Sequence, residues 1–215
     1  MSTSTPAFAE SLVTNTHGRQ YWIYTDDVFY QQRIANAGPY QKKNLIRLRD
    51  LKPNARTIID VGANIGMNLK ALNLLHPGID VHAIEINAEA AQHLGALIPP
   101  AHVYNTSILD FAPTRQWDLC LIKGVLIHIN PDMLPQVYDK LVTSTARYLM
   151  VAEYYNPVPV AIPYRGHSDR LFKRDFAGEI LERYPHMQLV DYGFAYRRDP
   201  NFPQDDITWF LMERR

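Results

Sequence analysis

The feature that most constrains this chain is the alternation of short apolar runs with helical segments through its middle. Five runs have the length and the β-branched content of buried strands, and they lie at 57–63, 81–86, 102–108, 118–124 and 148–154. Helical segments separate several of them, at 67–75, 88–97 and 133–142. Because right-handed crossovers place successive strands in one sheet, the pattern predicts a doubly wound α/β fold with a parallel sheet and helices on both faces.

The two ends of the chain depart from this alternation. Residues 156–170 are rich in Pro, Gly and polar groups and predict a long loop. A helix is expected at 174–184, and two strands at 189–196 and 208–214 predict an antiparallel pair that closes the edge of the sheet. Residues 28–51 look mostly helical, with Gly38-Pro39 as an interruption, and are expected to cover the sheet or its cleft.

Length and composition limit the organisation of the chain. Its 215 residues, 47% of them hydrophobic, favour a single domain over 1–215, with a helical cover or lid in 1–50 and a Rossmann-like core in 57–214. Lys and Arg (22) balance Asp and Glu (22), which argues against a partner such as nucleic acid or an anionic membrane. The one cysteine, Cys120, lies in an apolar run and is expected to be a buried reduced thiol.

No apolar run approaches the length of about 18 residues that a membrane helix needs. The first twelve residues have neither a basic start nor a long apolar stretch. We therefore expect a cytoplasmic protein that is a monomer or a homodimer and acts on a small molecule.

The most informative segment is Asp60-Val61-Gly62-Ala63-Asn64-Ile65-Gly66, which joins the first predicted strand to the first helix. Open α/β sheets bind ligands at this position, and glycines there allow a tight turn and close approach of the backbone. The dinucleotide pattern G-x-G-x-x-G would need glycines at 64 and 67, where this chain has Asn64 and Met67. The segment therefore argues against a nicotinamide site.

The segment instead resembles the first motif of class I methyltransferases, acidic-x-G-x-x-x-G, whose turn holds the amino-acid part of S-adenosyl-L-methionine. Glu85 ends the second predicted strand, where a carboxylate would accept hydrogen bonds from the ribose hydroxyls. The resemblance implies a cofactor site at the ends of the first four strands, made by Asp60, Gly62, Asn64, Gly66, Glu85, Ile86, Ser107, Ile108, Lys123 and Gly124. In it, Ser107 and Ile108 would contact adenine, and Lys123-Gly124 would line the methionine end.

The second half of the chain resembles the methylases associated with pseudaminic acid biosynthesis. The similar segments are KGVLIHINPDMLPQVYDKL (123–141), AEYYNPVPVAIPYRGHSDRLFKRDFAGEIL (152–181), LVDYGFAYRRD (189–199) and FPQDDITWFLMER (202–214). The resemblance implies a class I methyltransferase fold and a small, sugar-like acceptor. The N-terminal part departs from that family and keeps only Tyr30 and Arg33 of a Y-x-x-R core, where Arg33 would pair with the cofactor carboxylate or would be a solvated helix residue.

Methyl transfer to a hydroxyl requires a base, and His128, which follows the fourth predicted strand, is the candidate catalytic residue. The alternative is a packed histidine with one hydrogen bond to the backbone. The acceptor is expected near side chains that follow the fifth strand, namely Tyr154, Tyr155, Tyr164, Arg165, His167, Arg170 and Lys173. Four of these would form a cationic site for a carboxylate or phosphate, unless they pair instead with Asp169 and Asp175 in a solvated loop.

Two other classes of function remain open. A nicotinamide oxidoreductase would share the fold but needs the dinucleotide turn, and a non-catalytic binding module would keep the fold without the chemistry. The sequence has no H-E-x-x-H motif and no Cys/His quartet, so we predict methyl transfer that needs no metal.

Overall fold

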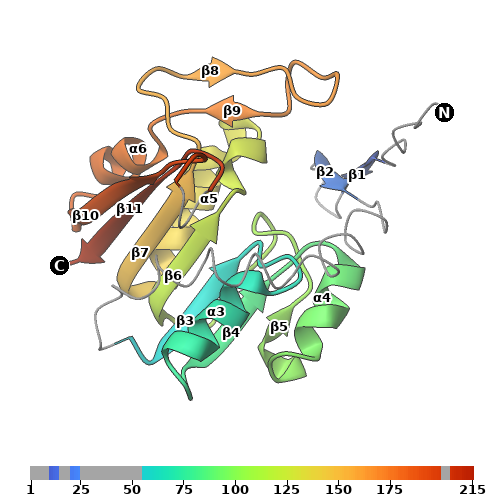
Figure 1. Ribbon diagram of the computed structural model, residues 1–215, viewed down its shortest axis with the longest axis vertical. Coiled ribbons are helices and arrows are strands. Elements are labelled where there is room, and N and C mark those ends of the chain that lie inside the picture. Colours follow the sequence, from blue (N-terminus) through green and yellow to red (C-terminus); the bar gives the residue numbers. More distant parts are fainter. Residues whose placement is uncertain (1–9, 15–19, 25–54, 200–203) are drawn as a thin grey trace.

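The computed structural model describes residues 10–14, 20–24, 55–199 and 204–215. Its main feature is a seven-stranded sheet with the strand order β10-β11-β7-β6-β3-β4-β5 (Figure 1). The parallel strands are β3 (Thr57–Val61), β4 (Asp80–Ile84), β5 (Val103–Tyr104), β6 (Trp117–Lys123) and β7 (Thr145–Glu153). The central strand β3 pairs with β4 on one side and β6 on the other, so its carboxyl end lies where the strand order reverses.

Helices cover both faces of this sheet. They are α3 (Met67–Leu75), α4 (Ala88–Gly95), α5 (Leu134–Ser144) and α6 (Phe176–Arg183). Figure 1 shows α3 on one face and α5 on the other. The doubly wound α/β fold expected from the alternation of strands and helices is therefore confirmed.

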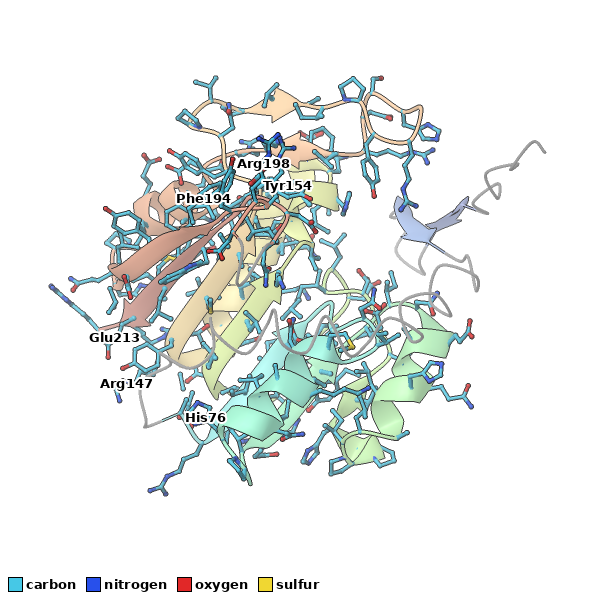
Figure 2. The ribbon with its side chains drawn as sticks, viewed as in Figure 1. His76, Arg147, Tyr154, Phe194, Arg198 and Glu213 are labelled. Carbon is cyan, nitrogen blue, oxygen red and sulfur yellow. The ribbon has the colours of Figure 1, made fainter. Side chains whose placement is uncertain are left out.

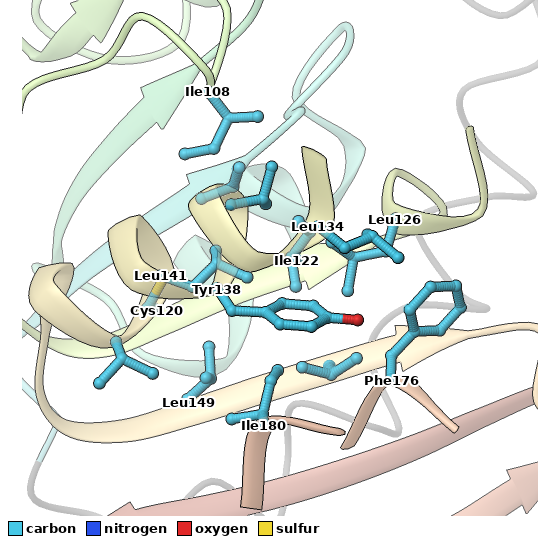
Figure 3. Close-up of a cluster of buried hydrophobic side chains, with 14 of the residues drawn as sticks. Ile108, Cys120, Ile122, Leu126, Leu134, Tyr138, Leu141, Leu149, Phe176 and Ile180 are labelled. Atoms are coloured by element: carbon cyan, nitrogen blue, oxygen red, sulfur yellow. The ribbon is translucent and has the colours of Figure 1, made fainter. Parts of the chain in front are cut away.

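The core shows how one strand serves both faces. Successive strand side chains point to opposite faces, and on β6 Cys120 and Ile122 pack against α5 and α6 while Leu119 and Leu121 pack on the side of α3. Figure 3 shows the first of these clusters around the ring of Tyr138. Cys120 is a buried free thiol, as expected, and burial raises its pKa to about 12.

The C-terminal strands form the predicted antiparallel pair. β10 (Met187–Ala195) pairs with β11 (Ile207–Arg214), and β11 pairs antiparallel with β7. A register shift interrupts β10 between Leu189 and Asp191. The mostly parallel sheet therefore ends in an antiparallel edge.

The strand expected at 102–108 is much shorter in the structure. Residue 102, the first of the expected strand, belongs instead to a 3-10 helix, Pro100–His102, because proline fits the first turn of a helix. After β5 the chain turns away, and the side chain of Asn105 donates to the carbonyl oxygens of Glu85 and Ile86 at 2.8 and 3.2 Å. Polar residues after the second position of the strand thus bond to the neighbouring loop and end the strand.

The long loop expected over 156–170 contains one short strand and forms most of a hairpin. The chain forms a β-hairpin from β8 (Val160–Ala161) and β9 (Phe172–Lys173), which pair antiparallel. Its tip is a two-residue turn between Tyr164 and His167, in which Arg165 and Gly166 have φ values of 51° and 83°. Positive φ at both central positions is the geometry of tight hairpin turns. Figure 1 shows the hairpin beyond the carboxyl ends of β6 and β7.

Near the N-terminus, β1 (Glu10–Thr14) pairs antiparallel with β2 (Gln20–Tyr24). The helical segment predicted at 28–51, with Tyr30 and Arg33, lies outside the described residues. In the described part of the chain, no helix has the length and apolar character needed to span a bilayer.

Candidate functional site

The turn after β3 has an unusual backbone. Gly62, Asn64 and Gly66 all have positive φ, at 75°, 52° and 80°. A Cβ atom on Gly62 would lie 2.4 Å from Cγ2 of Val125, and one on Gly66 would lie 2.6 Å from Cδ1 of Leu97. Both glycines are therefore required by the protein's own packing as well as by the conformation of the turn.

The backbone amides of this turn are all occupied. Those of residues 62 and 63 donate to the carbonyl oxygen of Ile84 at 2.8 and 3.0 Å, and that of residue 64 donates to Glu85 Oε2 at 2.8 Å. Those of residues 65 and 66 donate within the turn, to Asn64 Oδ1 at 2.8 Å and to the carbonyl oxygen of Ala63 at 3.0 Å. Phosphate-binding turns direct uncommitted amides at their ligand. The amides of this turn are instead committed to the protein.

Glu85 is held rigidly at the end of β4. Its Oε1 accepts from the amide of Asn87 at 2.8 Å, its Oε2 accepts from the amide of Asn64, and only 5% of the residue is exposed. Burial raises the pKa of this carboxyl, and the backbone hydrogen bonds oppose the rise. A carboxylate has about four acceptor sites, so one with two such bonds can still accept from a diol.

Asp60 is a second buried carboxyl, one strand away. It is completely buried in β3 and accepts from Asn68 Nδ2 at 3.1 Å. Burial raises its pKa to about 7, against the opposing effects of Asn68 and of the charge on Lys123 at the end of β6. Two acidic groups therefore end adjacent strands at the point where the strand order reverses.

The remaining predicted cofactor residues differ in position. Ser107 is mostly buried, and its hydroxyl accepts from the amide of Leu109 at 3.1 Å. Ile108 belongs to the buried cluster next to α5 (Figure 3) and is 6% exposed, which leaves little of it for a ligand. Ile86 is half-buried, and Gly124 is exposed with a φ of 69°.

His128 ends the 3-10 helix Leu126–His128 that follows β6. Its Nδ1 lies 2.8 Å from the carbonyl oxygen of Arg170. A carbonyl oxygen only accepts, so Nδ1 carries the proton of the neutral ring and Nε2 is the basic nitrogen. Burial lowers the pKa of His128, and the charge of Arg165 adds to that effect. The ring is therefore neutral, and its Nε2 basic, at neutral pH.

Glu153, at the end of β7, fixes the segment that carries His128. Its Oε1 accepts from the amides of Val125 and Leu126 at 2.9 and 3.0 Å. The residue is 3% exposed, burial raises its pKa to about 7, and its Oε2 has no hydrogen-bond partner among the residues described. Sequence reasoning missed this role, although an acidic residue that ends the apolar run YLMVAE was a usable signal.

The β8–β9 hairpin brings several predicted acceptor residues to this end of the sheet. The ring of Tyr164 lies 5.4 Å from that of His128, and the Arg165 guanidinium lies 5.1 Å from the Tyr164 ring. Lys173 Nζ lies 5.1 Å from the ring of Tyr154, which Figure 2 shows at the upper end of the sheet. Arg170 is buried, with 8% exposed.

Two of the predicted acceptor residues take a different place. Tyr155 is exposed and packs beside Phe210 of β11, with ring centroids 5.9 Å apart. His167 uses its backbone to close the hairpin tip with Tyr164. The structure thus gathers Tyr164, Arg165 and Arg170 around His128 and leaves Tyr155 on the neighbouring surface.

Sequence comparisons find no family model and no curated protein that matches this chain. The resemblance to pseudaminic-acid-associated methylases therefore stays a prediction.

Several solved structures share the fold. The mitomycin 7-O-methyltransferase MmcR has a TM-score of 0.63 and 14% identity, and the match covers 88% of this chain. It covers 59% of the length of MmcR. DesVI of Streptomyces venezuelae has a TM-score of 0.62 and 11% identity, over 88% of this chain and 98% of that one. The 1,6-didemethyltoxoflavin-N1-methyltransferase of Burkholderia thailandensis, solved with S-adenosylhomocysteine, has a TM-score of 0.61 and 15% identity, over 87% of each chain.

Identities this low establish the fold alone. The match agrees with the strand order, with the central switch point at β3 and with the antiparallel edge formed by β10 and β11. The chain therefore has the Rossmann-like fold of class I S-adenosylmethionine-dependent methyltransferases.

Proposed function

We propose that the protein is an S-adenosylmethionine-dependent methyltransferase that acts on a small molecule. The observation that carries the proposal is the turn over residues 62–66, whose amides are all committed within the protein while the carboxyls of Asp60 and Glu85 lie beside it. This arrangement offers acceptors to a ligand and withholds donors. It suits a nucleoside whose diol and ammonium group donate hydrogen bonds.

The same arrangement disfavours the nicotinamide alternative. A dinucleotide carries a pyrophosphate, which needs amide donors at the start of the first helix. The amides of residues 62–66, in the turn that leads into α3, have acceptors in the protein, and Asp60 places a buried carboxyl nearby. An anionic group over residues 62–66 would therefore meet committed amides and an unfavourable carboxyl.

When bound, S-adenosylmethionine would supply a methyl group that the acceptor takes from the sulfonium sulfur by in-line displacement, with S-adenosylhomocysteine as the leaving group. The residues of this chain would hold the ligand and manage the acceptor's proton. Glu85 would accept from the ribose hydroxyls with the lone pairs that its two amide bonds leave available. His128 Nε2 would take the proton of an acceptor hydroxyl, because Nδ1 already carries a proton that it donates to the carbonyl oxygen of Arg170.

The acceptor we propose is an anionic small molecule, such as a sugar acid. Arg165, at the tip of the hairpin, lies beside Tyr164, whose ring is next to that of His128. Lys173, in β9, lies beside Tyr154, and Arg170 is buried. Guanidinium and ammonium groups at this position would bind a carboxylate or a phosphate of the acceptor. The neighbours of similar fold include enzymes named for methylation at oxygen and at nitrogen, so both acceptor atoms belong in the test.

Ligand binding tests the first half of the proposal. S-adenosylhomocysteine should raise the melting temperature of the protein by mass action, whereas NADH at the same concentration should not. A shift with NADH alone would favour the oxidoreductase. No shift with either ligand at millimolar concentration would count against both.

Labelled methyl transfer tests the second half. Sugar acids, sugar nucleotides, nucleosides and amines are offered with methyl-labelled S-adenosylmethionine. We expect label in an anionic acceptor, with transfer reduced in Arg165→Ala. Tight binding of S-adenosylhomocysteine without transfer to any acceptor would instead support a binding module.

A further inference from the structure

Three side chains that the proposed methyl transfer does not use converge near the start of β4. Asp80 begins this strand and His82 lies two residues further along it, so both side chains are on the same face. His102 ends the 3-10 helix directly before β5, which pairs in parallel with β4. The cluster lies toward the amino end of β4, whereas Glu85 of the candidate site follows its carboxyl end.

The two imidazoles share one carboxylate oxygen. His82 Nε2 lies 3.4 Å from Asp80 Oδ1, and His102 Nδ1 lies 3.2 Å from the same atom. Neither contact has the geometry of a hydrogen bond, so within the described part of the chain both nitrogens are buried without a hydrogen-bond partner. His82 is 3% exposed. Native proteins rarely leave buried polar atoms without hydrogen bonds, so these two nitrogens have capacity for a further partner.

We infer that Asp80, His82 and His102 form a binding site for a divalent transition metal of the zinc class. One carboxylate oxygen and two imidazole nitrogens are the ligand types that zinc prefers, and the three atoms lie within 4.8 Å of one another. Ligands about 2.0–2.1 Å from a tetrahedral ion are about 3.3–3.4 Å apart, close to the 3.4 and 3.2 Å of the two nitrogen–oxygen pairs.

The surroundings of His82 support this assignment. Its other nitrogen, Nδ1, lies 3.2 Å from the hydroxyl of Tyr104. Metal-binding histidines usually use the second ring nitrogen in this way, which fixes the ring and leaves the first nitrogen as the ligand. The Tyr104 hydroxyl can accept from Nδ1, so His82 Nε2 can bind the ion in the neutral ring.

Two features shape how the ion would bind. The rings of His82 and His102 are stacked, with centroids 3.9 Å apart and planes 15° apart, so His102 must rotate to direct its lone pair at the ion. Its side chain is 30% exposed, which leaves room for that rotation. Arg115 Nη1 lies 3.9 Å from Asp80 Oδ2, and its charge opposes the binding of a cation.

An ion here would link β4 to the start of β5. β5 has two residues and is the outermost strand at this edge of the sheet. A bridge from Asp80 and His82 to His102 would hold that short strand in place. The metal would therefore act on stability, because it binds the folded arrangement and not the unfolded chain.

Titration of the metal-free full-length protein tests the site. ZnCl2 is added and heat is measured, and CoCl2 is added in parallel because cobalt absorption reports tetrahedral coordination. We expect one equivalent to bind and to raise the melting temperature. His102→Gln and Asp80→Asn should weaken binding by about a hundredfold or more, and His93→Gln on α4, outside the cluster, should leave it unchanged.

Arg115→Gln tests the site without removing any of the three side chains that would bind the metal. Removing this half-exposed positive charge beside Asp80 should tighten binding by about fivefold, which corresponds to about 1 kcal/mol, the interaction of two unit charges about 4 Å apart in water. Three results would overturn the site. They are no saturable zinc binding by the unmodified protein, a zinc affinity in His102→Gln and Asp80→Asn equal to that of the unmodified protein, and no increase of zinc affinity in Arg115→Gln. If His102→Gln fails to fold, the Arg115→Gln result still decides the matter.

Discussion

Glu85→Gln separates the structural work of the Glu85 carboxyl from its proposed role in binding. The carboxyl accepts two backbone hydrogen bonds of 2.8 Å, from Asn64 and Asn87, on a residue that is 5% exposed. A hydrogen bond to a charged group contributes about 1.5–3 kcal/mol. Glutamine keeps one carbonyl oxygen and so one of the two bonds, while its amino group faces the other backbone amide.

The expected loss of stability is at the lower end of that range. Burial raises the pKa of Glu85, which means that the charged form is costly to bury, and a neutral amide avoids that cost. We expect the free energy of unfolding to fall by about 1.5 kcal/mol. At about 2–4 °C per kcal/mol for a chain of this size, the melting temperature should fall by about 3–6 °C.

The loss of affinity should exceed the loss of stability. If the carboxylate also holds the ribose hydroxyls, S-adenosylhomocysteine should bind the variant less tightly by about 1.5–3 kcal/mol, a rise in Kd of about 10- to 150-fold. Calorimetric titration well below both melting temperatures measures this. Glu182→Gln, an exposed position on α6, is the matched control and should change neither quantity. An unchanged Kd in Glu85→Gln, together with the expected drop in melting temperature, would refute the binding role and leave a purely structural one.

Three further predictions follow from the site. His128→Asn should lower kcat by about a hundredfold or more if the ring is the base, and full activity in the variant would assign the ring to packing. Because the pKa of His128 is lowered, the acidic limb of the unmodified enzyme's pH–rate profile should lie below pH 6.5. Glu153 has its pKa raised from 4.5 to about 7, so the folded state keeps a proton that the unfolded chain has lost; this stabilisation is complete below pH 4.5 and disappears as pH rises through 7. Denaturant titrations across that window should show the unmodified protein losing about 3 kcal/mol relative to Glu153→Gln, and parallel pH curves would contradict this. Gly62→Ala should destabilise the fold by about 1–3 kcal/mol, since the new Cβ meets Val125 in a left-handed backbone, and thermal unfolding measures it.

The sequence predicted the part of the fold that depends on local pattern. α3 begins and ends where it was expected, at Met67 and Leu75, because a glycine turn and an apolar stripe define it locally. The antiparallel strands β10 and β11 were predicted from two apolar runs joined by a loop alone. Local signals were sufficient for these elements.

Elements that depend on distant partners were predicted poorly. The expected strand at 102–108 ends early because the Asn105 side chain donates hydrogen bonds to the loop after β4. The sequence around Asn105 gives no signal for these distant partners. The β8–β9 hairpin was hidden by its prolines and short strands, although Arg165-Gly166 fits a two-residue turn. The Asp80 cluster was missed for a similar reason, since His102 reaches Asp80 only through the pairing of two strands.

The site divides into two hydrogen-bonded units, and this division determines how its variants should behave. Glu85 joins the ends of β3 and β4, where we place the cofactor. Glu153 joins the end of β7 to the segment after β6, and His128 joins that segment to the hairpin through the carbonyl of Arg170. The two units meet where Val125 packs over Gly62. Changes at Glu85 should therefore act mainly on cofactor affinity and changes at Glu153 mainly on turnover, while a side chain at residue 62 should disturb both at once.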